Sequence, residues 1–167
     1  MFKFKDGQTL IETITAVTII SMSLVAILSL GTISIYYGTQ SKEEVIASNL
    51  AREGIEIVRT IRDSNWLDPD KSAFDGISDG DWIVEYNNTS LSVAADSGSI
   101  TNCNNCVLFF NNFYQHTASG SSTPYKRLVK VEPTANPDIK HITSTVLWTI
   151  KTRVRSYSLE TYLTDWR

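Results

Sequence analysis

No Asp, Glu, Lys or Arg occurs between Thr13 and Gln40, although these four residue types make up 20% of the 167-residue chain. The rest of the chain is mixed polar and carries charges of both signs, and the formal net charge is only -3. Composition as a whole is ordinary for a soluble protein, whereas the distribution of charge is not. The first forty residues therefore differ in kind from the remainder.

Other features are also missing. No basic cluster follows the N-terminus and no nucleic-acid-binding motif can be read, which argues against a nucleic-acid partner. Nothing repeats at the period of a solenoid, so one compact domain with an appendage is expected. Only two cysteines and two histidines are present. Because no set of catalytic side chains can be recognised, the sequence predicts neither an enzyme nor a cofactor.

The uncharged stretch belongs to an apolar run that extends to Tyr37. About twenty apolar residues in a helix cross the roughly 30 Å hydrocarbon core of a bilayer, so the run predicts a membrane-spanning helix. A secretory signal peptide would have a shorter apolar region, and this run continues through Gly31. Lys3 and Lys5 precede the run. The positive-inside rule then predicts a single-pass protein with a cytoplasmic N-terminus.

Glu12 lies near the start of the apolar run. An ionised carboxylate without a partner is costly there, so this residue needs an explanation. Its side chain could extend to the headgroups at the cytoplasmic edge of the bilayer. Alternatively, it pairs with a positive charge from another chain, because opposite charges at contact distance in a low dielectric attract strongly enough to offset desolvation.

The first forty residues resemble the N-terminus of the precursors of type IV pilins and of the pseudopilins of type II secretion systems. In this family a short basic leader ends in Gly, a peptidase cuts after it, the new amino terminus is methylated, and Glu is the fifth mature residue. The matching residues are Lys3, Lys5, Gly7, Gln8 and Glu12. The match is specific because these features coincide at fixed spacing beside a membrane-length helix.

This resemblance implies a structural filament subunit, cleaved between Gly7 and Gln8, methylated on Gln8 and assembled through Glu12. The implied partners are other pilin subunits, a prepilin peptidase, an inner-membrane assembly platform, and the lipid bilayer before assembly. The implied final location is an extracellular or periplasmic filament, and a minor pilin or pseudopilin is favoured over the abundant subunit. Two features depart from the family: mature members commonly begin with Phe, and many carry a Pro inside the helix.

After Gly38 the sequence becomes amphipathic. Apolar residues recur at three- and four-residue steps from Ile46 to Ile61, which indicates one buried stripe along a helix. Pro69 and its acidic neighbours then end the helical pattern.

From Trp82 onward the apolar period shifts toward two, which predicts half-buried strands. The last two, at about 141–150 and 153–166, are close enough in sequence to form an antiparallel hairpin. The predicted fold class is α+β, with a long N-terminal helix packed on a C-terminal antiparallel β-sheet. The predicted parts are a leader peptide at 1–7, a transmembrane and assembly helix at 8–40, an amphipathic continuation at 41–66, and a globular β-rich head at 67–167.

A polar segment at 97–123 contains both cysteines, Cys103 and Cys106. A short structural disulfide is favoured if the head lies outside the cytoplasm, and a reduced pair is the alternative. A metal site is disfavoured because zinc needs four ligands and only His116 and His141 could supply imidazoles. Both histidines are predicted to be surface or strand residues. A contact specific to this subunit would lie in this segment.

A rival class is a membrane-anchored, extracytoplasmic binding module that does not polymerise. It predicts no cleavage at Gly7 and tolerance of Glu12→Ala. An anchored enzyme is disfavoured because no catalytic set converges in the sequence.

Overall fold

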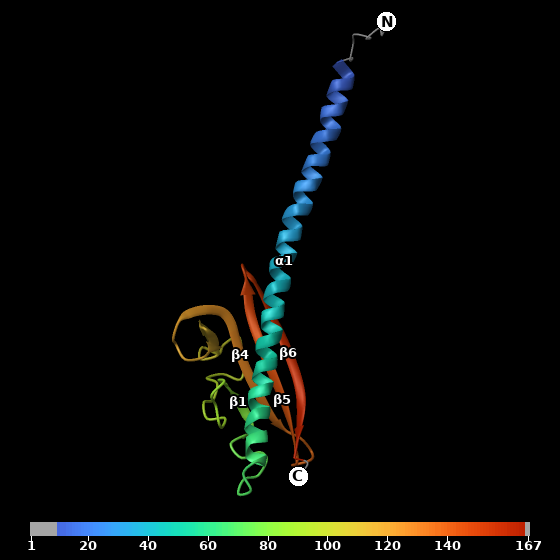
Figure 1. Ribbon diagram of the computed structural model, residues 1–167. Helices are drawn as coiled ribbons and strands as arrows, with labels where there is room; N and C mark the ends of the chain where they lie inside the picture. The colour runs from blue at the N-terminus through green and yellow to red at the C-terminus, as the bar shows by residue number, and fades with distance from the viewer. Residues whose placement is uncertain (1–9, 166–167) are drawn as a thin grey trace. The chain divides into compact units, whose positions relative to one another are not determined.

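The computed structural model describes residues 10–165. They form two compact units that divide between Lys42 and Glu43. One helix, α1 (Leu10–Trp66), runs through both units and can be followed from blue to green in Figure 1. The first unit is this helix alone, and the second contains the rest of α1 and every described strand.

The first unit has no interior of its own. Its side chains are exposed apart from a few partly covered ones, and Leu24 and Ile35 are 56% and 73% exposed. No charged residue interrupts it between Thr13 and Gln40, and no Pro breaks its backbone hydrogen bonds. By length and composition, this helix can cross a membrane.

From Glu43 onward, α1 acquires a buried face. Small and branched apolar residues follow one another at three- and four-residue steps on this face, which confirms the predicted stripe. The helix ends at Trp66, three residues before Pro69, and this end was also predicted. The buried apolar positions are Ala47, Leu50, Ala51, Gly54, Ile55, Ile57, Val58 and Ile61.

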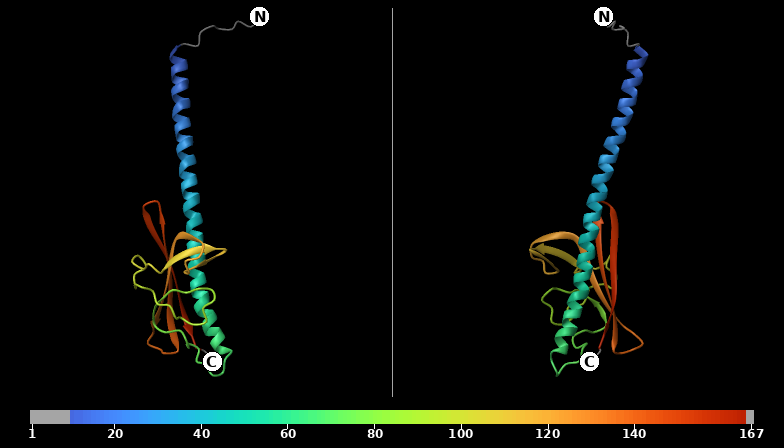
Figure 2. Two further views of the ribbon diagram at one scale, coloured as in Figure 1. Left: turned by 90° about the vertical axis from the view of Figure 1, so that its left-hand side faces the viewer. Right: turned by 45° about the vertical axis from the view of Figure 1, so that its right-hand side comes forward.

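The strands form one antiparallel sheet in the order β3-β2-β4-β5-β6, and β1 pairs with β4. Orange and red strands β4 to β6 lie beside the green part of α1 in both views of Figure 2. The predicted C-terminal hairpin is confirmed as β5 and β6, which pair from Ile139↔Thr164 to Ile150↔Arg153. The strands are β1 (Gly80–Trp82), β2 (Val107–Asn111), β3 (Phe113–Gln115), β4 (Ser121–Pro133), β5 (Ile139–Ile150) and β6 (Arg153–Thr164).

The core lies between α1 and one face of the sheet, so the α+β class is confirmed. Near the end of the helix, Val58 and Ile61 pack with Val129 and Ile142. One or two turns earlier, a second cluster packs around the indole of Trp148. The alternation of strand side chains places these apolar groups on one face. The second cluster consists of Ala47, Leu50, Ala51, Leu108, Tyr125, Val146 and Trp148.

Two details of the sheet differ from the sequence-based expectation. The alternation of apolar residues after Trp82 suggested a longer first strand, but β1 ends at Trp82. Beyond it, the Asn88 amide donates to the Glu85 carbonyl at 3.0 Å, closing a turn instead of extending a ladder. The polar segment at 97–123 is predicted to be a long loop with one short strand at about 107–110; β2 lies at that place, but the segment also contains β3 and the start of β4.

Candidate functional site

Glu12 lies in the first turn of α1 with an exposed side chain. A carboxylate in this position is favoured by the positive end of the helix dipole. No salt bridge joins it to another residue within the described range 10–165. The predicted cleavage site, Gly7 and Gln8, lies outside the described residues. The carboxylate of Glu12 is thus open to a partner from outside this part of the chain.

Most Ser and Thr hydroxyl groups in the described part of the first unit donate to carbonyls of the helix itself. The Thr18 hydroxyl, for example, donates to the Ile14 carbonyl at 2.7 Å. Such back-bonding covers polar atoms that would otherwise be costly in lipid or against apolar neighbours. The hydroxyls bonded to carbonyls three or four residues earlier belong to Thr13, Thr15, Thr18, Ser21, Ser23, Ser29, Thr32 and Thr39.

The head contains a cavity of about 300 Å³ between the segment that follows β1 and the segments that flank the β2–β3 hairpin. Glu85 is fixed at this cavity. Its Oε1 accepts hydrogen bonds from the His116 amide at 2.9 Å, the Thr117 amide at 2.7 Å and the Thr117 hydroxyl at 3.0 Å. The Glu85 amide in turn donates to Asn88 Oδ1 at 2.6 Å. These bonds leave the carboxylate little freedom.

His116 is 9% exposed and follows the end of β3. The prediction of a surface or strand histidine is therefore wrong for this residue. Neither ring nitrogen makes a hydrogen bond of good geometry to a described residue, although the backbone of Asn105 and Val107 lies close enough to favour the protonated ring. Burial, and next the positive charge of Arg127, lower the pKa of His116 to about 4. The imidazole is consequently neutral at neutral pH.

His141 does lie on a strand, β5, as predicted. Its Nδ1 lies 3.4 Å from a Glu132 carboxylate oxygen, and its Nε2 lies 3.2 Å from Glu160 Oε2. The ring stacks on Tyr162 with 4.7 Å between centroids. Since the two carboxylates lie on opposite sides of the ring, they do not converge on one point with it. No cluster of three or more metal-ligating groups occurs in residues 10–165.

Arg127 is a fully buried cation on β4 that the sequence analysis missed. Its guanidinium donates to the Val84 carbonyl at 2.7 Å and to the Leu50 carbonyl at 3.3 Å. It also lies 3.3 Å from a Glu53 carboxylate oxygen. Burial lowers the pKa of Arg127, and Glu53 opposes this shift. The residue joins α1, β4 and the segment after β1.

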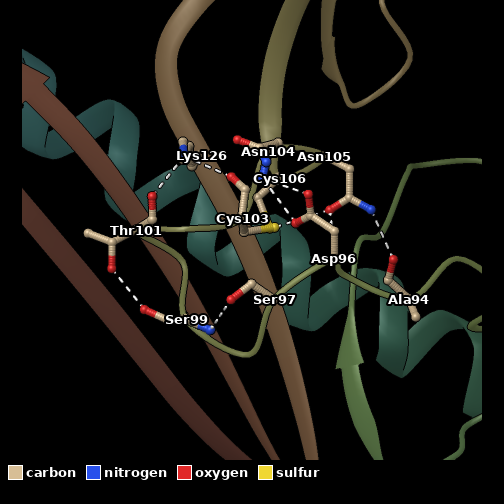
Figure 3. Close-up of a disulfide and its surroundings, with 10 residues drawn as sticks. All are labelled: Ala94, Asp96, Ser97, Ser99, Thr101, Cys103, Asn104, Asn105, Cys106 and Lys126. Carbon is tan, nitrogen blue, oxygen red and sulfur yellow. Dashed lines mark hydrogen bonds between the residues drawn. A yellow bond between two sulfur atoms is a disulfide. The ribbon is translucent and has the colours of Figure 1, made fainter.

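Cys103 and Cys106 form a disulfide, and both are fully buried. Figure 3 shows the Asp96 side chain pointing at this loop. Both Asp96 oxygens accept from the Asn104 amide, at 2.9 and 3.0 Å. On the other side, Lys126 donates to the Cys103 carbonyl at 2.7 Å. The peptide group between Cys103 and Asn104 is therefore held on both sides, by Lys126 and by Asp96.

Asn105 completes this arrangement. Its side-chain amide donates to the Ala94 carbonyl and accepts from the Asp96 amide, both at 3.0 Å. Asn104 and Asn105 both border the cavity. The disulfide loop thus forms one rigid rim of the cavity that holds Glu85.

No protein-family model matches the chain, and no curated protein or solved structure matches it with significance. The fold and the site define the class: a protein with a membrane-length apolar helix and an α+β head that carries a small polar cavity.

Proposed function

We propose that this chain is a structural subunit of a type IV pilus-like filament, of the minor pilin or pseudopilin kind. A prepilin peptidase would cut after Gly7, and the mature subunit would polymerise through α1 into an extracellular or periplasmic filament. The observation that supports this most concerns residues 10–40 of α1. They are largely exposed, and the one charged residue among them, Glu12, lies at the family's spacing from Gly7.

The exposed helix needs a cover from outside the chain. Burying one Leu, Ile or Val side chain is worth about 1.5–3 kcal/mol, and apolar residues surround the helix on all sides. A bilayer covers this surface before assembly, and the helices of other copies cover it in a filament. Helical stacking uses a heterologous interface that does not close, which suits an open polymer.

Glu12 favours a polymer over a permanent anchor. In lipid its carboxylate is a cost, whereas the amine of Gln8 from a neighbouring subunit would compensate it in the filament. We further propose that methylation of Gln8 keeps this amine from being lost by cyclisation of the N-terminal glutamine.

Mass and shear fractionation test this proposal. The native protein is expected to lack residues 1–7, to carry one added methyl group, and to occur in both the membrane and sheared surface material. Glu12→Gln should be processed and inserted, yet fall at least about tenfold in the sheared fraction, because its neutral amide cannot pair with the amine. Glu44→Gln, which changes an exposed residue of the same helix, is the matched control.

The rival function is an anchored binding module, and the cavity at Glu85 is the observation that favours it. A full-length mass in the membrane and an empty sheared fraction would support this rival. A Glu12→Gln variant that polymerises like the native chain would likewise remove the assembly role of Glu12.

A further inference from the structure

The cavity beside Glu85 has the size of a site for one small group. Its volume of about 300 Å³ lies at the lower end of the range for ligand pockets. Glu85 Oε1 is occupied by three donors from His116 and Thr117. Its Oε2 has no hydrogen-bond partner among the described residues and is not among the shielded polar atoms. One oxygen of a rigidly held carboxylate is thus open to a ligand.

Charge decides which ligands the cavity accepts. Among the described residues that line the cavity, Glu85 alone carries a charge at neutral pH, since the buried imidazole of His116 is neutral. The nearest guanidinium, that of Arg127, is fully buried and bonded to Glu53 and to two backbone carbonyls. It cannot reach a ligand. A carboxylate without an accessible cation repels anions and attracts a positive group.

The remaining walls fit an aliphatic stem. Ile83, Val93, Val107 and Phe109 line the cavity, and Phe109 adds a ring that can attract a cation through its face. Asn104 also borders the cavity, and no hydrogen bond within the described part of the chain uses its side-chain amide. Its carbonyl oxygen offers a second acceptor for an ammonium group, which has three donors to satisfy.

The site is partly held in place before any ligand arrives. The backbone amide of Asn104 donates to both carboxylate oxygens of Asp96, and the Cys103–Cys106 disulfide closes the loop around it, so the backbone of Asn104 is fixed. Glu85 is fixed by its own three donors. Preorganised groups lose little freedom on binding, so a small ligand can be held despite its small contact area.

We propose that this cavity binds a primary ammonium group on an aliphatic stem, through Glu85 Oε2 and Asn104, with the stem against the apolar wall. The chemistry is that of a lysine side chain or of a free alkyl diamine. This site does not depend on filament assembly, and its tests do not use Glu12.

Chemical shifts of backbone amides in the full-length chain in non-ionic detergent measure binding directly. The probes are Nα-acetyl-lysine methylamide, its uncharged analogue Nα-acetyl-norleucine methylamide, the diamine putrescine, and methyl β-glucopyranoside as a neutral polyol. The lysine probe or putrescine should shift the amides of Asn104 and Thr117 and saturate in the millimolar range. The norleucine probe should bind at least about tenfold more weakly, which corresponds to about 1.4 kcal/mol.

Glu85→Gln isolates the charge. Glutamine keeps an oxygen that can accept from His116 and Thr117, so the local fold is retained and the melting temperature should stay within a few degrees. Ammonium binding should fall at least about tenfold, whereas Glu44→Gln should bind like the native chain. A preference for the lysine probe over putrescine would identify a protein side chain as the ligand, and the reverse order a free amine.

Three results overturn the proposal: equal affinity for the lysine and norleucine probes, native affinity in a folded Glu85→Gln variant, or saturation by the glucoside with no response to either amine. Absence of any shift with both amines at tens of millimolar overturns it as well.

Discussion

The two parts of α1 place the same kinds of residue in opposite environments. Leu24 is 56% exposed and Leu50 is 3% exposed, although both are leucines in one continuous helix. Up to Lys42 apolar residues surround the helix, so no face is distinguished. From Glu43 charged residues separate the apolar ones into a stripe, and the sheet covers that stripe. The arrangement of apolar residues around the helix, more than their number, therefore decides which part of α1 is buried by other residues of the same chain.

Because of this difference, substitutions in the two parts of α1 should affect different measured properties. Changes in residues 43–66 or in the sheet should alter the free energy of unfolding of the head. Changes in residues 10–42 should alter membrane insertion or assembly and leave the head unaffected. The predictions for the arginines and for the glycines each set a buried position against an exposed one, and the unfolding of the full-length chain in detergent is followed by tryptophan fluorescence.

The largest effect is expected for Arg127→Ala. The change removes a buried guanidinium and leaves the carbonyls of Leu50 and Val84 without their donor. It also leaves Glu53 without its counter-ion and opens a cavity. The free energy of unfolding, from urea titration, should fall by about 3–5 kcal/mol.

Arg59→Ala is the matched control, because Arg59 pairs with Glu56 on the exposed face of the same unit and its side chain is 38% exposed. Exposed ion pairs contribute little, so the loss should stay below about 1 kcal/mol. Equal losses in the two variants would show that burial does not distinguish these arginines.

Acidification should reveal the buried imidazole of His116. Its pKa is about 4 in the folded chain, against an ordinary value of 6.5 for histidine. Between pH 6.5 and pH 4 His116 is protonated in the unfolded chain but not in the folded chain. The free energy of unfolding therefore falls as the pH decreases through this range. The full loss is about 3 kcal/mol at pH 4 and below.

His116→Leu removes this contribution, because leucine does not titrate, and it costs no hydrogen bond of good geometry, since neither ring nitrogen makes one to a described residue. The difference in unfolding free energy between the native chain and the variant should therefore change between pH 6.5 and pH 4 and be constant above. Parallel pH curves for the two proteins would contradict the buried, neutral state of His116.

Local patterns were sufficient to predict the fold class, although not every strand. The spacing of the apolar stripe predicted the second half of α1, and Pro69 predicted where the helix ends. The alternation of apolar residues after His141 predicted the β5–β6 hairpin. The candidate assembly residues Gly7, Gln8 and Glu12 came from a family motif, and their role stays a prediction. Their geometry toward another subunit is a property of two chains and cannot be obtained from one.

The cavity could not be predicted, because its parts meet only through tertiary contacts. Glu85 and His116 lie 31 residues apart in sequence, and nothing local indicates that the one binds the other's backbone. Arg127 did leave a signal. It shares its parity on β4 with Tyr125 and Val129, whose side chains face the core. A charged residue at an inward position of a strand predicts a buried partner, although not which one.

Two glycines of α1 give the smallest but most direct test of the comparison. A Cβ at Gly54 would contact Ser144 Oγ and lie 3.1 Å from a Val129 methyl carbon, because the helix approaches the sheet most closely there. Gly54→Val should therefore lower the free energy of unfolding by about 1–3 kcal/mol through overpacking. At Gly38 nothing lies within 4 Å of such a Cβ. Gly38→Val should change the stability of the head by less than about 0.5 kcal/mol, because it alters only helix propensity in the first unit. If both variants lost stability equally, residues 10–42 would have to contact the head, and the independence of the two halves of α1 would be wrong.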